Sequence, residues 1–373
     1  MIGIDFGTST TEVAVVVDGQ PVLLPGPRED RVIPSIVAYP PAGRTIVGSE
    51  AEARWRIDLE NTIHSVKRIV GRRWFDQEVA EFRSTCGYAL ERGQNHEILI
   101  DCRGGKLTPT TVATTLLERI LGTMNLPVDV PVTLGVPPSF GSDQRLALVE
   151  IANAAGLERV TTMDEPYLAV LPYLRREEQQ KKVAVFDLGG GTFDLAVLDV
   201  RGRVHRLLAC DGDPYLGGND IDLGMADWVR SQVLVQKHWD LRSRPESWTA
   251  LIGVCREAKK RLSVLPQTTI SLGLVDPVVA DVTVPISRHD LNPTLHEAMG
   301  RCFAICDHVL REAGLRASDI DEVVLAGGST YLPQVREAVA TYFGAPPRSE
   351  LPADHLVAMG AALASAARDS RGR

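Results

Sequence analysis

The chain has 373 residues, of which 44% are hydrophobic and 24% charged, and its formal net charge is −8. This composition excludes disordered, collagen-like and disulfide-scaffold proteins, and the acidic balance gives no bulk attraction to nucleic acid or to an anionic membrane. The length predicts two or three folding units of about 150 residues each. No apolar run approaches the roughly 20 residues that span a bilayer, and the first residues do not resemble a signal peptide. We therefore expect a cytoplasmic protein that binds neither nucleic acid nor membrane.

Six cysteines are scattered along the chain, and no two of them form a CxxC pair. Cys302 and Cys306 lie four positions apart and would share one face of a helix. We interpret the six as small buried apolar residues, with a metal or disulfide role as the less favoured alternative.

The first half of the chain predicts a β-hairpin, then an irregular stretch, then helices alternating with a buried strand. Thr108 and Pro109 have the residue types of a helix cap and a first helical turn. The expected elements, in order, are strands over 2–5 and 12–17 around a turn at 7–10, a third strand over 21–24, a helix near 58–70, a helix from Thr108 to about Met124, a strand over 130–136, a helix over 142–155 and a helix from Glu165.

The second half predicts a further hairpin and then a mixture of helices and strands. The expected elements are strands over 182–187 and 193–200, helices near 220–237 and 247–265, strands over 268–274 and 278–284, a long helix from the Ser287–Asp290 region to Gly314, a strand over 322–326 and two final helices.

The opening pattern of the chain occurs again near its middle. The sequences IDFGT at 4–8 and FDLGGGT at 186–192 both place an aspartate at the end of a strand, followed by glycine and threonine. The two aspartates, Asp5 and Asp187, lie about half the chain apart. We interpret this as one structural unit used twice.

Each of these turns has the residue types of an anion site. Glycine lets the backbone turn sharply and brings N–H groups close to an anion, and threonine adds a hydroxyl donor. An aspartate beside phosphate must act through Mg²⁺, through its water shell, or by orienting an attacking water. No GxxxxGK[ST] loop is present, so two facing turns would hold a polyphosphate between them. For one turn alone, a plain hairpin is the alternative.

Further segments follow in an order and spacing that fit one family. They are SVKRIVGR at 65–72, DEP at 164–166, FDLGGGTFD at 186–194, LGGND at 216–220, VLAGGST at 324–330 and VAMGAA at 357–362. With these segments the chain resembles the nucleotide-binding domain of Hsp70 chaperones, within the superfamily of actin, sugar kinases and Hsp70 ATPases. The resemblance covers essentially the whole chain.

The resemblance implies an α/β fold of the duplicated actin-like ATPase type, with two lobes around a deep nucleotide cleft. Each lobe would have an inner subdomain, built on a mixed five-stranded sheet, and a smaller outer subdomain. The implied boundaries are 1–176 for lobe I, with 1–34 and 107–176 inner and 35–106 outer, and 177–373 for lobe II, with 177–216 and 295–373 inner and 217–294 outer.

The resemblance also implies ATP or ADP with Mg²⁺ as cofactors, with K⁺ as a further candidate, and it assigns residues to roles. Asp5 and Asp187 would hold Mg²⁺ through water. The implied catalytic residues are Lys67, Glu165, Asp187, Asp194 and Thr192: Lys67 would neutralise charge on the γ-phosphate, and Glu165 with Asp194 would position the attacking water. The implied nucleotide-binding residues are Gly7, Thr8, Ser9, Gly189, Gly190, Gly191, Thr192, Gly217, Gly218, Lys259, Lys260, Ser263, Gly327, Gly328, Ser329, Tyr331 and Asp354.

The base pocket departs from the family pattern. Lys260 and Tyr331 stand where two arginines usually sandwich the adenine, and Arg256 stands at the position of a ribose-contacting glutamate, with Glu257 beside it. An ammonium stacks on a base less well than a guanidinium, whereas a tyrosine ring can stack. We therefore expect Tyr331 to provide most of the contact with the base.

The resemblance implies slow ATP hydrolysis that opens and closes the cleft, as in molecular chaperones. A nucleotide-exchange factor or a J-domain-like co-chaperone are the implied partners, although Thr161 replaces the arginine that meets J-domains. Pro137 and Arg145 match a relay of the family, and Pro137 is equally explained as the end of a strand. The chain stops where a linker to a peptide-binding domain would begin, so we expect no substrate-binding domain in it.

Three other functions stay open at this point. A nucleotide-gated switch could bind a partner without chaperone activity. An actin-type filament former is less favoured because of the outer segment 217–294. A sugar or acetate kinase is less favoured because Lys67 and Glu165 indicate water as the acceptor.

Overall fold

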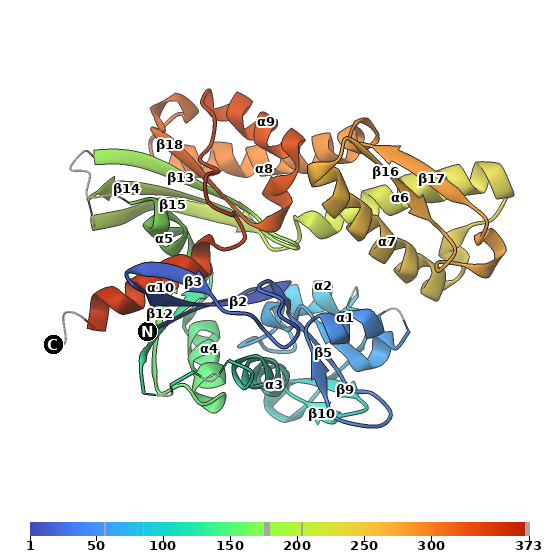
Figure 1. Cartoon of the computed structure of the whole chain (residues 1–373), viewed down its shortest axis with the longest axis horizontal. Helices are drawn as coiled ribbons and strands as arrows, with labels where there is room; N and C mark the ends of the chain where they lie inside the picture. The colour runs from blue at the N-terminus through green and yellow to red at the C-terminus, as the bar shows by residue number, and fades with distance from the viewer. Residues whose placement is uncertain are drawn as a thin grey trace. The chain divides into compact units, whose positions relative to one another are not determined.

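The computed structural model describes the whole chain except Arg56, Thr85, Asn125, Val128, 175–179, Arg203 and 370–373. The chain forms two compact units (Figure 1). The first consists of Met1–Glu178 and Asp354–Arg373, and the second of Gln179–Ala353. Helices and strands mix in both, which confirms the predicted α/β class. Within the described residues, no helix has the length and apolar character needed to cross a membrane.

The first unit is built on a mixed sheet whose strands run in the order β12-β11-β1-β2-β3, with β4 paired to β2 beside this path. Strand β1 pairs in parallel with β11 and in antiparallel with β2. The strands are β1 (Ile2–Phe6), β2 (Thr10–Val17), β3 (Gln20–Leu23), β4 (Ile33–Pro34), β11 (Pro131–Val136) and β12 (Arg159–Asp164). The predicted opening hairpin is confirmed. The sheet has six strands where five were expected, because β4 pairs with β2 beside the five-stranded path.

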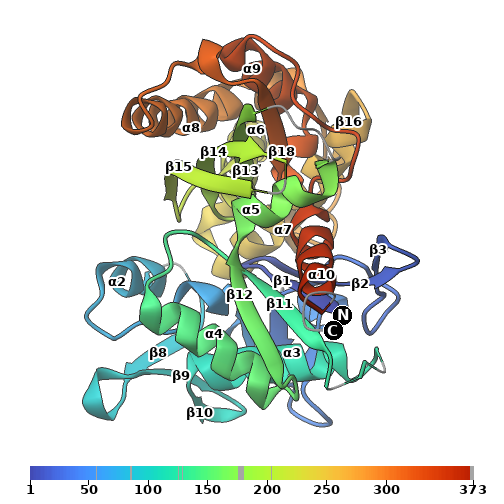
Figure 2. The same ribbon diagram turned by 90° about the vertical axis from the view of Figure 1, so that its left-hand side faces the viewer.

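The two faces of this sheet are covered by different helices (Figure 2). Ile2, Ile4 and Phe6 are buried in one core with residues of α3 (Pro109–Leu121) and α4 (Ser142–Ala154). Successive residues of a strand point to opposite faces, so Gly3 and Asp5 lie on the other face. That face meets α10 (Leu356–Asp369), because a Cβ added at Gly3 would lie 2.5 Å from the Ala358 carbonyl oxygen.

Helix α10 belongs to the first unit, although the expected second lobe ran to residue 373. In Figure 1 the red α10 lies along the blue strands near the N-terminus. Its Ser365 Oγ donates to the Ile2 carbonyl at 2.8 Å and lies 2.8 Å from Thr133 Oγ1. Small residues such as Ala362 let the helix approach the sheet closely. The other expected boundary, at 176, lies outside the described residues.

Two small three-stranded sheets and short helices fill the rest of the first unit. They are β5 (Ile36–Ala38), β6 (Ile46–Val47) and β7 (Thr62–His64); β8 (Ala89–Arg92), β9 (Ile98–Cys102) and β10 (Gly105–Leu107); and helices α1 (Ser49–Trp55), α2 (Gln77–Arg83) and α5 (Glu165–Val170). The helix expected near 58–70 is wrong. Residues of β7 pair with β5, and Ser65 then adopts a left-handed backbone with φ 56° before a 3₁₀ turn over Val66–Arg68.

The second unit repeats the central pattern of the first. Its sheet has the order β15-β14-β13-β18, and β13 pairs in antiparallel with β14 and in parallel with β18, as β1 does with β2 and β11. The strands are β13 (Gln180–Leu188), β14 (Phe193–Arg201), β15 (Val204–Asp213) and β18 (Glu322–Ala326). Five strands were expected. Among the described residues there are four, together with one isolated bridge between Val324 and Arg348.

The helices of the second unit agree closely with the prediction. They are α6 (Gly218–Lys237), α7 (Pro245–Val264), α8 (Asn292–Glu312) and α9 (Pro333–Phe343), and a separate hairpin joins β16 (Gln267–Ser271) to β17 (Thr283–Ser287). The strand expected over 278–284 begins only at Thr283. The reason is that Asp276 accepts from the Val278 N–H and starts a 3₁₀ turn instead.

The six cysteines are free thiols. Four of them are buried, as predicted: Cys86, Cys255, Cys302 and Cys306. Cys102 and Cys210 are partly exposed instead.

Candidate functional site

The first predicted turn is closed by one backbone hydrogen bond, and Ser35 forms hydrogen bonds to two of its carbonyls. The Gly7 N–H donates to the Thr10 carbonyl at 2.9 Å, and a Cβ at position 7 would clash with that carbonyl oxygen. Ser35 Oγ donates to the Gly7 carbonyl at 2.9 Å, and the Ser35 N–H donates to the Ser9 carbonyl at 2.8 Å. Ser35 therefore fixes the predicted phosphate turn. The sequence carries no signal for this role, because Ser35 is a single serine between two short strands and belongs to no motif.

The second turn has the same closure, since the Gly189 N–H donates to the Thr192 carbonyl at 3.0 Å. The equivalence extends to the acids beside the turns. Asp187 lies opposite Asp194 across β13 and β14, and Asp5 lies opposite Glu12 across β1 and β2. Each hairpin thus places two carboxylates side by side on one face, next to its turn. Glu12 was missed, although it lies seven residues after Asp5, as Asp194 lies after Asp187.

The three glycine segments of the second unit converge on one another. The Gly218 N–H donates to the Gly189 carbonyl at 3.0 Å, and Ser329 Oγ donates to the same carbonyl at 2.8 Å. A Cβ at Gly217 would lie 2.8 Å from the Gly191 nitrogen, and one at Gly327, where φ is +81°, would lie 2.5 Å from Asp187 Oδ1. Glycine is required because backbone meets backbone here. The structure therefore brings together predicted residues more than 100 positions apart.

Lys259 supports this junction from α7. Its Nζ donates to the Gly218 carbonyl at 2.5 Å and lies 2.8 Å from Asp222 Oδ1. The Asp222 side chain is fully buried and also pairs with Arg256 at 3.1 Å. Burial lowers the pKa of Lys259, although the charge of Asp222 opposes this shift. Lys259 thus stabilises the glycine turn and is also a predicted nucleotide-binding residue.

The other two predicted nucleotide-binding residues of α7, Lys260 and Ser263, make only local contacts within their own helix. Lys260 is exposed and its Nζ lies 2.9 Å from Glu257 Oε1 one turn earlier. Ser263 Oγ donates to the Lys259 carbonyl at 3.5 Å. Tyr331 is half-buried, and the guanidinium of Arg336 from α9 lies 5.7 Å from its ring centroid. Arg336 therefore fixes the orientation of the tyrosine ring that we expect to contact the base.

Lys67 and Glu165 meet in the first unit, although 98 positions separate them. Lys67 Nζ donates to Glu165 Oε1 at 2.8 Å, and its ammonium lies 5.6 Å from the Phe140 ring centroid. Lys67 is only 3% exposed, which is unusual for a lysine and excludes an ordinary solvated face. The 3₁₀ turn over Val66–Arg68 and the start of α5 bring the two side chains together.

Arg145 connects the neighbourhood of Glu165 to a proline-rich loop. Its Nη2 donates to Asp164 Oδ1 at 2.8 Å and to the Pro137 carbonyl at 3.2 Å, and its Nε donates to the Phe140 carbonyl at 2.9 Å. Asp164 directly precedes Glu165, and Phe140 carries the ring beside Lys67. One guanidinium thus ties the loop that ends β11 to both catalytic candidates.

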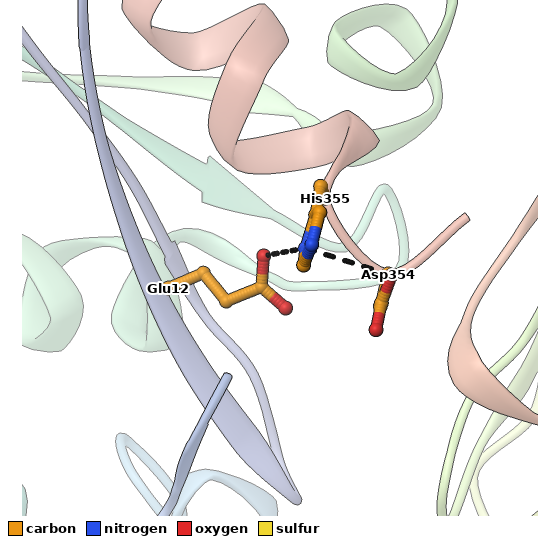
Figure 3. A group of neighbouring side chains, drawn as sticks. All are labelled: Glu12, Asp354 and His355. Carbon is orange, nitrogen blue, oxygen red and sulfur yellow. Dashed lines mark hydrogen bonds and ion pairs between the residues drawn. The ribbon is translucent and has the colours of Figure 1, made fainter. Parts of the chain in front are cut away.

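Asp354 lies in the first unit, at the residue where the chain returns from the second. Figure 3 shows it beside His355 and Glu12. His355 Nδ1 lies 2.9 Å from Glu12 Oε2 and 3.5 Å from Asp354 Oδ1. Burial raises the pKa of Glu12 to about 7, and His355 only partly opposes this. Burial lowers the pKa of His355, but the bond and charge of Glu12 and the charge of Asp354 outweigh it and raise that pKa.

We expect the free energy of unfolding to fall as the pH rises from about 4.5 to about 7, because of Glu12. The folded protein holds this proton more tightly than the unfolded chain does, so the stabilisation is complete below pH 4.5 and is lost through the folded pKa of about 7. The raised pKa of His355 acts in the same direction. The shift corresponds to up to about 3 kcal/mol. Urea unfolding between pH 4.5 and 8 in EDTA should show this loss in the parent protein relative to Glu12→Gln, and parallel curves would refute it.

A family model described as "Hsp70 protein" matches residues 1–370. The chain belongs to the Hsp70 family. Members of this family are generally ATPases that bind ATP or ADP with Mg²⁺ and interact with co-chaperones and nucleotide-exchange factors. The family match covers both hairpins, the Lys67–Glu165 pair and the glycine junction of the second unit.

The residues of both hairpins suit the magnesium ion that the family implies. Asp5 and Asp187 offer carboxylate oxygens, the ligands that Mg²⁺ prefers. The Asp187 carboxylate keeps its place beside the turn only because position 327 is glycine, where a Cβ would lie 2.5 Å from Oδ1. The donor types at both turns therefore fit a hydrated Mg²⁺ ion.

Proposed function

We propose that this chain is an Hsp70-type nucleotide-binding domain that binds ATP with Mg²⁺ and slowly hydrolyses it to ADP and phosphate. The observation that carries the proposal is the repeated hairpin, in which the same glycine bond closes both turns and a pair of carboxylates flanks each. Backbone N–H groups at such turns bind phosphate oxygens. A plain hairpin without a ligand would explain one such turn, whereas two matched turns favour a shared polyphosphate.

The catalytic roles follow from the chemistry of the side chains. Bound Mg²⁺ would neutralise charge on the phosphates. The Lys67 ammonium would stabilise the negative charge that develops on the γ-phosphate, and its buried position keeps that charge interaction unscreened. Glu165, together with Asp194, would orient the attacking water, and the 2.8 Å bond from Lys67 holds the Glu165 carboxylate in place for this.

The same proposal includes the outer subdomains, a further cation and a partner protein. The small sheets within 35–106 and the helices and hairpin within 217–294 would be the outer subdomains, and hydrolysis would control opening and closing between the lobes. K⁺ is a further candidate cation. A nucleotide-exchange factor would be a partner, and Arg145, bonded to the Pro137 carbonyl and to Asp164, would transmit the state of the site to the surface.

Removing magnesium should abolish the activity. ATP incubated with the protein and excess Mg²⁺ should release phosphate without any added sugar, and excess EDTA should stop the release, because carboxylates can lie beside phosphates only through the metal. Phosphate release is the measurement, and a preparation of Asp187→Asn tests dependence on the predicted site. Full hydrolysis in EDTA contradicts the proposal, and a requirement for a sugar acceptor would replace it with a kinase.

Tyr331→Ala should weaken ATP binding by one to two orders of magnitude. A base stacked on an aromatic ring gains roughly 1–3 kcal/mol, and each tenfold in affinity is about 1.4 kcal/mol. Pyrophosphate binding should hardly change, because pyrophosphate would touch only the glycine turns. Calorimetric titration with both ligands measures this, and Tyr331→Phe, which keeps the ring, is the matched control. If Tyr331→Ala loses thermal stability but keeps its ATP affinity, the ring packs against α9 and does not contact the base.

A further inference from the structure

One imidazole and two carboxylates gather where the chain enters α10. Glu12 extends from β2, and Asp354 and His355 directly precede the helix, with the His355 ring facing both acids (Figure 3). The nearest ligand atoms of the three residues all lie within 4.8 Å of one another. All three residues belong to the first unit. Glu12 is the carboxylate beside Asp5 at the first turn, and no catalytic or nucleotide-binding role derived above uses Glu12 or His355.

We propose that Glu12, Asp354 and His355 form a binding site for a divalent transition-metal ion of the Zn²⁺ class. Carboxylate oxygen and imidazole nitrogen are ligands that Zn²⁺ accepts readily, whereas Mg²⁺ favours oxygen alone. Three protein ligands leave one tetrahedral position for water. The site would adjoin the proposed magnesium site, since Glu12 lies opposite Asp5 across β1 and β2, but its ligands differ and it does not depend on nucleotide binding.

The spacing of the three side chains already suits such an ion. Two ligands at about 2.1 Å from a tetrahedral metal lie about 3.4 Å apart, and no two such ligands can be more than about 4.2 Å apart. His355 Nδ1 lies 2.9 Å from Glu12 Oε2 and 3.5 Å from Asp354 Oδ1, and the remaining pair lies within 4.8 Å. Side-chain movements of about an ångström would complete the coordination.

The burial of Glu12 also supports a metal ion at this cluster. Its side chain is 2% exposed, and its Oε2 bonds His355, while its Oε1 has no hydrogen-bond donor among the described residues. A buried carboxylate is costly unless paired, and the nearby cations here are His355 and the more distant Arg31. A divalent ion would neutralise the charge of both acids.

The second unit contains a natural comparison. His308 Nε2 lies 3.7 Å from Asp211 and 3.6 Å from Glu312, the same three residue types, but these side chains are about half exposed. Exposed groups of this kind are held loosely in water and form weak metal sites. His308 therefore provides a matched control for His355.

The metal would fix the point at which the chain leaves the second unit. Asp354 follows Ala353, whose carbonyl accepts from the Gly327 N–H at 3.1 Å in the second unit. A ligand bond at Asp354 therefore anchors the returning segment to β2 at its first residue. Metal binding should consequently stabilise the first unit.

Titration of the chelator-treated full chain with Co²⁺, in excess Mg²⁺ and without nucleotide, tests the proposal. We expect one saturable equivalent with the visible spectrum of oxygen and nitrogen ligation, and a rise in Tm. His355→Gln and Glu12→Gln should each weaken Co²⁺ binding at least about 100-fold, since even outer partners of a metal site contribute 10–100-fold. His308→Gln should bind like the parent.

Three results would overturn the proposal. They are no saturable binding by the parent, unchanged Co²⁺ affinity in Glu12→Gln, and a thiolate charge-transfer band, which would assign the ion to cysteine. Glu12→Gln keeps the shape of the side chain and removes a buried charge, so it decides the question even if His355→Gln fails to fold.

Discussion

Lys67→Ala should leave ATP bound but slow its hydrolysis by about 10²–10³-fold, the usual cost of losing one contact to developing charge. The ammonium is buried and bonded to Glu165 at 2.8 Å, so its removal takes away a charge and also frees the carboxylate that would orient water. Single-turnover hydrolysis measures the rate, and equilibrium titration measures ATP affinity. Unchanged turnover would remove Lys67 from the mechanism.

Two further variants complete this test: a control at another lysine–glutamate pair, and a double variant that separates charge stabilisation by Lys67 from its positioning of Glu165. Lys106→Ala breaks another lysine–glutamate pair of the first unit, with Glu91, at 2.5 Å, but both side chains are about half exposed, so its turnover should match the parent. The double variant Lys67→Ala/Glu165→Gln completes a cycle. If Lys67 only positioned Glu165, the double variant would be as slow as Glu165→Gln alone. If it also stabilises charge, the double variant should be slower than Glu165→Gln.

Gly360→Ala should destabilise the protein by about 4 kcal/mol or more, a range in which single substitutions are exceptional. The residue lies in α10, and an added Cβ would clash with the Leu168 carbonyl oxygen and lie 2.6 Å from its carbon. Both contacts are backbone atoms of α5, so the two helices must separate. Since α5 begins at Glu165, the change should also displace the proposed catalytic carboxylate.

Gly300→Ala is the matched control. Gly300 lies in α8, is exposed, and has no atom of the described residues within 4 Å of an added Cβ. Replacing glycine by alanine within a helix should therefore stabilise the protein by up to about 1 kcal/mol. Urea unfolding of both variants gives the two free energies. A Gly360→Ala protein as stable as the parent would show that α5 and α10 are not in close contact.

The sequence predicted the hairpins and the long helices because each has a local pattern. Thr108 caps α3 by accepting from the Thr111 N–H at 3.1 Å, as its residue type indicates. The strands β12 and β15 were not predicted, since their polar residues, such as Thr161 and Thr162, give no apolar alternation. Only pairing with β11 and β14 makes them strands. The helix expected near 58–70 failed for the same reason, because β7 is fixed by its partner β5.

The residues of the candidate site also fall into two groups, those that belong to a local sequence pattern and those that act through distant contacts. The family segments identified the residues of the glycine turns and the Lys67–Glu165 pair, and the structure brings each set together within its unit. Ser35, Arg336 and His355 were not identified. Each acts through a contact between distant segments, such as Ser35 with Gly7 or His355 with Glu12, and no sequence spacing encodes such contacts.

The first unit is interrupted in the gene by the whole of the second, and this sets an order for synthesis. Strand β1 is translated before the second unit, the helix that covers one face of its sheet is translated after it, and the Ile2–Ser365 bond joins residues 363 positions apart. The second unit is continuous and can fold as soon as it emerges. Its folding brings residues 180 and 353 into one compact unit, which shortens the loop that the first unit must still close. A nascent chain arrested before residue 356 should therefore carry a protease-resistant second unit and a first unit still open to attack.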